Sequence, residues 1–357
     1  MERPSRPVSS HSAYRQAGVD VDAQERALAR VRELAAKTVT PGVLAGIGGF
    51  GGLFRPDLED VDDPVLVASA DGVGTKLAVA RMAGDFSSVG RDLVNHCVDD
   101  VLVQGARPLF FLDYVGAGTL EPARVVELVG GVADGCRENG CALLGGETAE
   151  MPGFYRPGDY ELVGFVVGLV DRRALLGPER VGPGDVLVGL PSSGLHTNGY
   201  SLARRVLFDR LGLAPDAPAP WAEGRRTVAQ ELLAVHRSYL APLAALLRHP
   251  GLHALAHVTG GGLTDNLPRA LPGGTRAVVR TGAWEVPAIF GFLQEHGEVS
   301  DEEMRRVFNL GIGMVAVVAA DAVGEVLASL RASGERAVVL GGVEAGGSGV
   351  DYRAGGG

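Results

Sequence analysis

The sequence has few cysteines and no long apolar segment. Cys97, Cys136 and Cys141 are odd in number and lack C-x-x-C spacing, which excludes a disulfide framework and a cysteine metal site and indicates reduced thiols. The longest apolar runs, at 163–170 and 313–320, are too short to span a bilayer. The sequence also lacks the basic start followed by an apolar core that is typical of a signal peptide. We therefore expect a cytoplasmic protein with no membrane partner.

The chain also lacks any block of like charges, and its net charge is −10 with a pI near 5.3. This balance argues against a broad contact with the nucleic-acid backbone, so we expect no nucleic-acid partner. It still permits a phosphorylated small molecule, because local donors and a divalent cation overcome a distant acidic surface. Lysine is scarce: Lys37 and Lys76 are the only two among 33 basic side chains, a bias that coding composition explains.

The length of 357 residues exceeds what one hydrophobic core usually serves and predicts two domains. Hydrophobic periodicity and turn residues predict alternating helices and strands in both halves, so the expected fold class is mixed α/β. We expect a disordered arm at 1–13, domains at 14–174 and 175–345, and a mobile tail at 346–357. The expected helices lie at 22–37, 87–104, 122–138, 200–210 and 228–247, and the expected strands at 65–68, 109–112, 142–144, 162–170, 186–190, 313–319 and 337–340.

Glycine is abundant, with 53 residues, and is concentrated in one segment, 46–52. Its spacing fits the dinucleotide fingerprint G-x-G-x-x-G, but a helix and a Pro-Gly turn precede it where that fingerprint needs a strand. A mobile loop over a phosphate is the better interpretation, because bare backbone N–H groups close on an anion without interference from Cβ atoms. The candidate residues are Gly46, Gly48, Gly49, Phe50, Gly51 and Gly52.

A sharper motif follows the expected strand at 65–68. Asp71-Gly72-Val-Gly-Thr75-Lys76 places a carboxylate, two glycines, a hydroxyl and an ammonium where open α/β sheets bind ligands. It is not a Walker A loop, because Gly-Lys-[Ser/Thr] occurs nowhere in the chain. The alternative is a turn that ends a strand and carries an incidental lysine.

The expected helix at 87–104 carries a polar face. Such a face alone is more often solvated than functional. With Asp71 and Glu147 nearby, its carboxylates would form a site for Mg²⁺, which prefers hard oxygen ligands and shares substrate phosphates. The polar residues at helical spacing are Asp92, Asn95, His96 and Asp99, with Asp100 adjoining.

Two further loops are candidate phosphate sites. Ser192 to Gly199 is a strand-to-helix loop rich in small donors, and such loops offer N–H groups to anions. It lacks G-x-S-x-G, which excludes a serine hydrolase, and His196 within it fits a structural and a catalytic role equally well. Thr259-Gly-Gly-Gly262 is the other loop. Several anion loops and acidic metal ligands together predict binding of ATP and a phosphorylated substrate.

Taken in order, these segments resemble one family of purine biosynthesis, the phosphoribosylformylglycinamidine cyclo-ligases, also called aminoimidazole ribonucleotide synthetases. The resemblance runs from Tyr14 to about Gly342, nearly the whole chain. Agreement of so many ordered motifs by chance is negligible. The motifs are GIGGFGGLF (46–54), DGVGTKL (71–77), VLVQGARPLFFLDY (101–114), LLGGETAEMPG (143–153), SSGLHTNGYSL (192–202), HVTGGGLTDNLPR (257–269) and FNLGIGM (308–314).

The resemblance implies the two-domain fold of aminoimidazole ribonucleotide synthetase. In that fold the amino-terminal domains of a homodimer pair their sheets into a shared barrel, and a carboxy-terminal α/β domain packs beside it. ATP would bind near the glycine loop and the inter-subunit cleft. The implied reaction converts formylglycinamidine ribonucleotide and ATP into aminoimidazole ribonucleotide, ADP and phosphate.

The resemblance also implies roles for the matching residues. Asp71 and Asp100 would hold Mg²⁺, with Asp99 and Glu147 as further candidates, and Lys76 would neutralise phosphate charge. The nucleotide would contact loop 46–52 together with Asp71, Gly72, Thr75 and Lys76. The substrate or the transferred phosphoryl group would contact Ser193, Gly194, His196, Asn198, Thr259, Gly260 and Gly261, with His196 the best candidate for proton transfer.

Three positions depart from the family pattern, which commonly has Lys at Arg15, Asn at Asp99 and Pro at Leu195. Asp99 adds a negative charge beside the expected metal site. The alternatives are a catalytically silent ATP-binding scaffold and a related small-molecule kinase of the same fold. A selenophosphate synthetase would need a reactive cysteine early in the chain, and none precedes Cys97.

Overall fold

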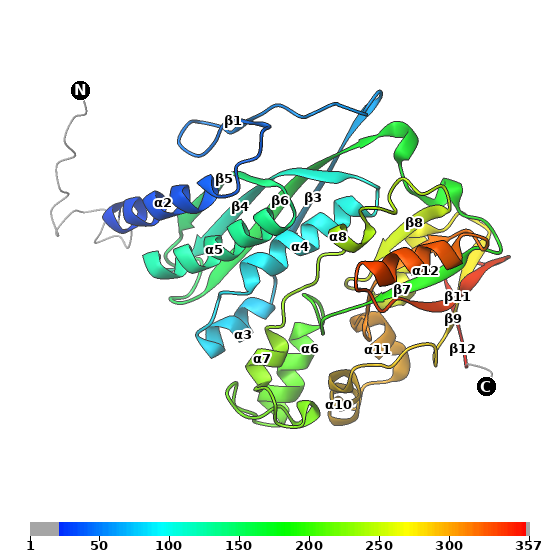
Figure 1. The fold of residues 1–357 in the computed structure, drawn as a ribbon. Coiled ribbons are helices and arrows are strands. Elements are labelled where there is room, and N and C mark those ends of the chain that lie inside the picture. Colours follow the sequence, from blue (N-terminus) through cyan, green and yellow to red (C-terminus); the bar gives the residue numbers. More distant parts are fainter. Residues whose placement is uncertain (1–20, 355–357) are drawn as a thin grey trace.

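A computed structural model describes residues 21–354, which form two large sheets with flanking helices and one two-stranded sheet (Figure 1). This arrangement confirms the expected mixed α/β class. The expected arm at 1–13, Arg15 and the last three residues lie outside the described residues. None of the helices between 21 and 354 has both the length and the apolar character needed to cross a membrane.

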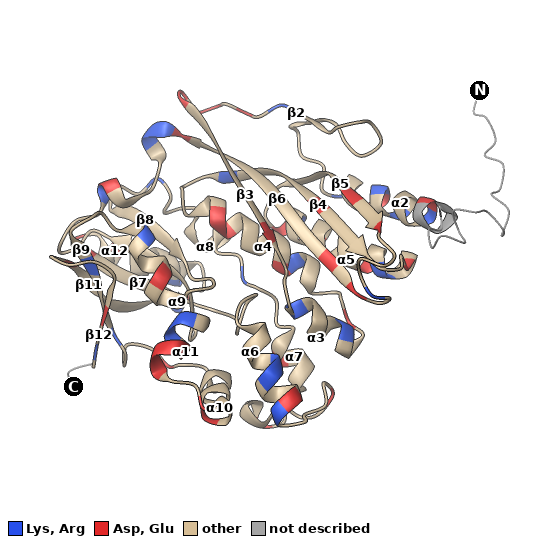
Figure 2. Ribbon diagram, turned by 180° about the vertical axis from the view of Figure 1, so that it is seen from behind, with Lys and Arg blue, Asp and Glu red and all other residues tan. Residues whose placement is uncertain are grey.

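The first half forms a four-stranded sheet in the order β3-β6-β4-β5, in which only β4 and β5 are parallel. The helices α4 and α5 cover one face, and Figure 2 shows no helix over the other face. A short hairpin of β1 and β2 precedes the sheet. The elements are α2 (Val21–Ala36), β1 (Val43–Ala45), β2 (Leu53–Phe54), β3 (Pro64–Gly72), α3 (Lys76–Ala83), α4 (Val89–Leu102), β4 (Arg107–Ala117), α5 (Pro122–Glu138), β5 (Ala142–Glu150) and β6 (Tyr160–Asp171).

The helices α4 and α5 cross in close contact because glycine stands at the crossing. A Cβ atom at Gly90 would lie 2.4 Å from both the Leu128 carbonyl oxygen and the Val132 amide nitrogen, so a larger residue does not fit there. The close approach buries Val94 of α4 against Gly135 of α5, while Leu93 is buried against Gly164 of β6. It fixes α4 on the sheet, with its polar residues directed toward the second half of the chain.

The second half forms a six-stranded sheet in the order β12-β9-β11-β7-β10-β8, antiparallel except between β12 and β9. The strand β10 is buried along its whole length. The elements are β7 (Val186–Pro191), α6 (Tyr200–Arg204) with a π-helical continuation (Arg205–Arg210), α7 (Val228–Leu232), α8 (Leu240–Leu243), β8 (Leu252–His257), α9 (Gly262–Asn266), β9 (Thr275–Arg280), α10 (Ala288–Gly297), α11 (Asp301–Val307), β10 (Ile312–Val318), α12 (Val323–Ala332), β11 (Val338–Ala345) and β12 (Val350–Arg353). Short 3₁₀ turns lie at Arg172–Ala174, Pro178–Arg180, Pro220–Ala222 and Leu267–Ala270.

The structure differs from the sequence prediction at the end of the chain. We expected a mobile tail from 346, but Val350–Arg353 form β12 along the edge of β9. The Arg353 guanidinium also pairs with Glu344 of β11, at 2.7 and 2.8 Å. Four residues are too few to show a strand period, so the pairing partner rather than the local pattern creates this strand.

The predicted continuous helix at 228–247 is also wrong. The chain forms α7, leaves the helical path over residues 233–239, and resumes as the single turn α8. Polar side chains from elsewhere in the fold bind the backbone of segment 233–239, which removes the need for helical pairing.

Candidate active site

The candidate active site lies at the junction of the two halves. The first half contributes the end of β3 and one face of α4, and the second contributes loop 192–199, segment 233–239 and the end of β8. A pocket of about 400 Å³ opens at this junction, between β3, α4 and β8. Its polar lining consists of Ser69, Asp100, Gln104, His257, Asn266 and Arg269.

Segment 233–239 is held by the polar face of α4. Asp92 Oδ1 accepts a hydrogen bond from the backbone N–H of His236 at 2.6 Å, and Asp99 Oδ1 accepts one from Tyr239 at 2.9 Å. Asn95 Nδ2 donates to the His236 carbonyl at 2.7 Å. The predicted polar face of α4 is therefore buried against the second half of the chain, where it positions the His236 side chain.

Lys76 forms a buried ion pair with Asp92, with Nζ 2.8 Å from Oδ2 and both side chains fully buried. Its Nζ also donates to the carbonyls of Ala234 at 2.7 Å and His196 at 3.2 Å. An ammonium has three N–H groups, so all of its donors are used within the protein. This geometry does not support the expected neutralisation of phosphate charge, and Lys76 instead fastens two segments of the second half to the first.

A chain of hydrogen-bonded side chains crosses the junction from the end of β3. Asp71 Oδ2 lies 2.8 Å from His96 Nε2, and His96 Nδ1 lies 2.7 Å from Thr197 Oγ1. Thr197 Oγ1 in turn lies 3.2 Å from His236 Nδ1. This series of hydrogen bonds therefore connects β3, α4, loop 192–199 and segment 233–239.

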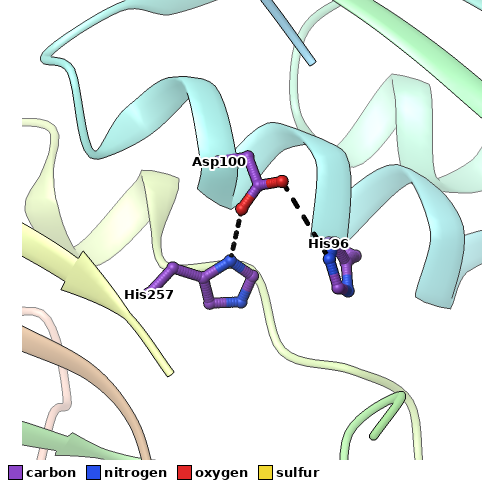
Figure 3. A group of neighbouring side chains, drawn as sticks. All are labelled: His96, Asp100 and His257. Atoms are coloured by element: carbon purple, nitrogen blue, oxygen red, sulfur yellow. Dashed lines mark hydrogen bonds and ion pairs between the residues drawn. The ribbon is translucent and has the colours of Figure 1, made fainter. Parts of the chain in front are cut away.

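The chain continues from His236 to a second carboxylate. His236 Nε2 lies 3.2 Å from His257 Nε2, and His257 Nδ1 lies 2.9 Å from Asp100 Oδ1. Figure 3 shows Asp100 between two rings, with one oxygen toward His257 and the other toward His96. The complete hydrogen-bonded series has five links between the carboxylates of Asp71 and Asp100, which only accept hydrogen bonds when ionised.

Charge and burial have opposite effects on the pKa values of the carboxylates in this hydrogen-bonded series. Burial acts to raise the pKa of Asp71 and Asp100, but hydrogen bonds and charge from His96 and His257, respectively, outweigh it and hold both pKa values below the ordinary range. Both carboxyl groups are therefore ionised at neutral pH. Burial lowers the pKa of His236 well below its ordinary value, so that ring is neutral.

Asp71 and Asp100 are the predicted metal ligands that the structure brings together. Both approach His96 Nε2, at 2.8 and 4.0 Å, and their side chains are 41% and 30% exposed. Ionised, accessible carboxylates are the oxygen donors that Mg²⁺ prefers, so this pair fits the ion. Asp99 differs, because its side chain is fully buried and its Oδ2 faces His236 and His257. Burial raises the pKa of Asp99 well above its ordinary value.

Glu147 lies outside this group within the described residues. It stands on β5, whereas Asp71 stands on β3, and β6 and β4 lie between them. With about 4.8 Å between neighbouring strands, the two residues are roughly 14 Å apart. The order of strands in the sheet, which the sequence pattern does not reveal, separates these two predicted ligands.

Loop 46–52 also lies at the β5 edge of the sheet. A Cβ atom at Gly52 would come within 2.4 Å of the Leu144 side chain, so glycine permits this contact with β5. The loop joins the antiparallel strands β1 and β2, which excludes the strand-to-helix geometry of a dinucleotide site. Phe50 at the loop is fully exposed.

The motif at 71–76 does more than end a strand. Asp71 and Gly72 still pair with β6, and Thr75 immediately precedes α3. Thr75 Oγ1 lies 3.2 Å from Ser201 Oγ of α6. The motif therefore contacts both halves of the chain beside the candidate site.

Loop 192–199 closes around His196. The Ser193 backbone N–H donates to His196 Nε2 at 3.1 Å, and the His196 ring stacks on His236 with centroids 4.0 Å apart. His196 is 1% exposed, and its ring covers Gly313, where a Cβ atom would lie 2.5 Å from the ring. Burial lowers the pKa of His196 well below its ordinary value. In this position His196 holds the loop together, and its role in proton transfer stays a prediction.

The two predicted substrate loops lie side by side. A Cβ atom at Gly260 would lie 3.2 Å from Asn198 Oδ1, so glycine lets loop 259–262 approach loop 192–199. Asn266 Nδ2 donates to the Gly260 carbonyl at 3.1 Å and steadies the turn, and Asn309 Nδ2 donates to the Gly194 carbonyl at 2.9 Å. Both loops lie near the junction, whereas loop 46–52 does not.

Sequence reasoning missed two central residues of the site, His236 and His257. His257 directly precedes Val-Thr-Gly-Gly-Gly, and a polar residue at the end of a strand before a glycine loop was a usable signal. His236 gave no such signal, because the helix expected at 228–247 placed it among ordinary helical positions.

Known proteins match the chain over both halves. Residues 56–170 match the family described as AIR synthase related protein, N-terminal domain, and residues 182–353 match its C-terminal domain. The chain is 50% identical over 336 residues to the phosphoribosylformylglycinamidine cyclo-ligase of an Anaeromyxobacter species, which covers 94% of this chain and 96% of that protein. The enzyme of the same name from Trichlorobacter lovleyi is 48% identical over 333 residues, or 93% and 95% of the two chains.

Solved structures with low sequence identity share the fold. Thiamine-monophosphate kinase from Stenotrophomonas maltophilia superposes with a TM-score of 0.69 at 19% identity, covering 92% of this chain and 96% of that chain. The hydrogenase maturation protein HypE in complex with ATP superposes with a TM-score of 0.65 at 18% identity, covering 92% and 89%. By the identity of its sequence to named relatives over nearly its whole length, the chain belongs to the phosphoribosylformylglycinamidine cyclo-ligase family.

Proposed function

We propose that this protein is an ATP-dependent cyclo-ligase of purine biosynthesis, which closes formylglycinamidine ribonucleotide to aminoimidazole ribonucleotide with release of ADP and phosphate. The observation that carries the proposal is the identity of about half the residues to named cyclo-ligases over nearly the whole chain. The junction pocket supports it, because its lining brings together the Asp100 carboxylate and the Arg269 guanidinium.

The chemistry requires ATP because an amide oxygen is a poor leaving group. Transfer of the γ-phosphoryl group to the formyl oxygen would turn that oxygen into phosphate, a good leaving group. The amidine-side nitrogen then attacks the activated carbon, and phosphate departs as the ring closes. Most of the catalytic work in such a sequence is positioning and charge neutralisation.

In this proposal Asp71 and Asp100 hold Mg²⁺, which would neutralise charge on the phosphates of ATP. His96 and His257 orient the two carboxylates and keep them ionised through the hydrogen bonds described above. Binding of ATP is supported by the ATP complex of HypE, which shares the fold. All three cysteines are free and buried, which is compatible with a reducing compartment. The proposal therefore includes a cytoplasmic location.

The proposal includes a homodimer formed through the uncovered face of the amino-terminal sheet. Leu66 of β3 and Phe165 of β6 expose 65% and 39% of their surface, and Figure 2 shows that face without a helix. Large apolar side chains gathered on an open sheet favour burial against a partner. Dimerisation would also bring a second copy to the β5 edge, where loop 46–52 and Glu147 lie apart from Asp71.

We expect Leu66→Glu to weaken dimer association at least tenfold, because a charge would be buried in the sheet-to-sheet interface. Light scattering coupled to size-exclusion chromatography over a range of concentrations measures the effect. Val286→Glu is the matched control, because Val286 is an exposed apolar residue, 40% accessible, outside both sheets. A Leu66→Glu variant that dimerises like the wild type would refute this interface.

The activity is tested by following ADP and aminoimidazole ribonucleotide together, with Mg-ATP and formylglycinamidine ribonucleotide. We expect equal amounts of both products from the wild type, and a loss of at least 100-fold in turnover for Asp71→Asn, which removes a charged ligand while preserving its shape. Asp209→Asn, an exposed carboxylate on the π-helical segment, should keep full activity. Formation of ADP without the imidazole would instead indicate a kinase, and the absence of both products a silent scaffold.

A further inference from the structure

Asp99, His236 and His257 converge on one buried point. His236 Nε2 lies 3.2 Å from His257 Nε2 and 3.5 Å from Asp99 Oδ2, and His257 Nε2 lies 4.0 Å from Asp99 Oδ2. The circumradius of a triangle with these sides places one point about 2.1 Å from all three atoms, within the usual Zn–N and Zn–O distances. All three side chains are buried.

The carboxylate of Asp99 has an unused oxygen at this point. Its Oδ1 accepts the Tyr239 N–H, but within residues 21–354 its Oδ2 has no hydrogen-bond partner, although the side chain is fully buried. A buried carboxylate oxygen without a partner is costly, and a bound metal ion is one way in which proteins compensate for it. The orphaned oxygen and the two imidazole nitrogens thus face the same position.

The other nitrogen of each imidazole is already held in the manner of a metal ligand. His257 Nδ1 bonds to the Asp100 carboxylate at 2.9 Å, and His236 Nδ1 bonds to Thr197 Oγ1 at 3.2 Å. Histidines that bind a metal almost always make such an outer bond, which fixes the ring and its tautomer. An ion bound to both Nε2 atoms would also replace the contact between the two imidazoles.

We propose that Asp99, His236 and His257 bind a divalent transition-metal ion of the Zn²⁺ class, at a site separate from the proposed Mg²⁺ pair. Two imidazoles and one carboxylate suit Zn²⁺, whereas Mg²⁺ prefers oxygen ligands alone. The neighbouring group of His96, Asp100 and His257 is a weaker candidate, since hydrogen bonds already occupy its ligand atoms. The ligands come from α4, segment 233–239 and β8, so the ion fastens the two halves of the chain together.

The test is the zinc content of the whole protein, produced in zinc-supplemented medium so that the ion can enter during folding, and then dialysed extensively. We expect one Zn²⁺ per wild-type chain and a loss of at least tenfold in retained zinc for Asp99→Asn and His236→Phe. Asp99→Asn keeps an acceptor for the Tyr239 N–H, and His236→Phe keeps a ring to stack on His196, so both variants should fold.

Two controls separate this site from others. Asp71→Asn, which alters the Mg²⁺ pair, and His249→Gln, which alters a histidine paired with Glu325 at the surface, should each retain one Zn²⁺ per chain. Wild-type protein from cobalt-supplemented medium should show the visible absorption bands of four-coordinate Co²⁺, which the Asp99→Asn variant should lack. A wild type without bound metal, or variants that retain as much zinc as the wild type, would overturn the proposal.

Discussion

Replacement of Lys76 by methionine is expected to lower the free energy of unfolding by about 3–5 kcal/mol, the usual cost of removing one partner from a buried ion pair. Methionine matches the length of the lysine stem but leaves the Asp92 carboxylate buried without its counter-charge. It also removes the donor that binds the carbonyls of Ala234 and His196. Urea denaturation followed by circular dichroism measures the difference.

The chain contains its own control for this substitution. Lys37, the other lysine, is exposed just after α2, so Lys37→Met should change the free energy of unfolding by less than about 0.5 kcal/mol. A double variant adds a second control. Asp92→Asn combined with Lys76→Met removes the unpaired charge while keeping an acceptor for the His236 N–H, and should recover part of the lost stability. If Lys76→Met alone matched Lys37→Met, the buried pair described above would be wrong.

A large pH-dependent change in stability is expected at Asp113, which lies on β4 beneath the helices. Burial raises the pKa of this carboxyl group to about 7, and its Oδ2 has no hydrogen-bond partner among the described residues. Because the unfolded chain has a pKa of about 3.9 there, the native state holds this proton more tightly. The stability that the native state gains from binding this proton more tightly is fully present below pH 4, and it is lost as the pH rises toward 7.

Asp113→Asn removes this pH dependence, since asparagine does not titrate. Relative to the wild type, the variant should therefore gain about 3 kcal/mol of stability between pH 5 and pH 8, from the shift in pKa. Urea unfolding curves at the two pH values give this difference directly. Asp209→Asn, at an exposed position, should show no such gain. Equal differences between Asp113→Asn and wild type at both pH values would show that this carboxyl group does not titrate in that range.

Local pattern was sufficient to predict much of the fold. The helix α5 begins and ends at the predicted residues, Pro122 and Glu138, because proline at its start and apolar spacing along it are both local signals. The same kind of signal placed Asp71 at the end of a strand and Asp100 on α4, and these two carboxylates do lie together around His96. A strand end and a helical face are each defined by neighbours in sequence.

The remainder depended on contacts between distant segments. Segment 233–239 reads as part of a helix, but three side chains of α4 bind its backbone and change its path. Lys76 follows a glycine turn, as a phosphate-binding lysine would, but the facing Asp92 and two carbonyls enclose it. Loop 46–52 and Asp71 were both predicted to contact ATP, whereas the strand order places them at opposite edges of the sheet within one chain. None of these contacts produces a periodic pattern or a fixed spacing that could be recognised in the sequence.

The backbone bonds of segment 233–239 also restrict motion between the two halves. A hinge rotation at the connection 172–184 would pull this segment away from α4. Asp92 would then lose the His236 N–H, and Lys76 would lose the Ala234 carbonyl. We therefore expect the two halves to unfold together rather than to open as separate domains.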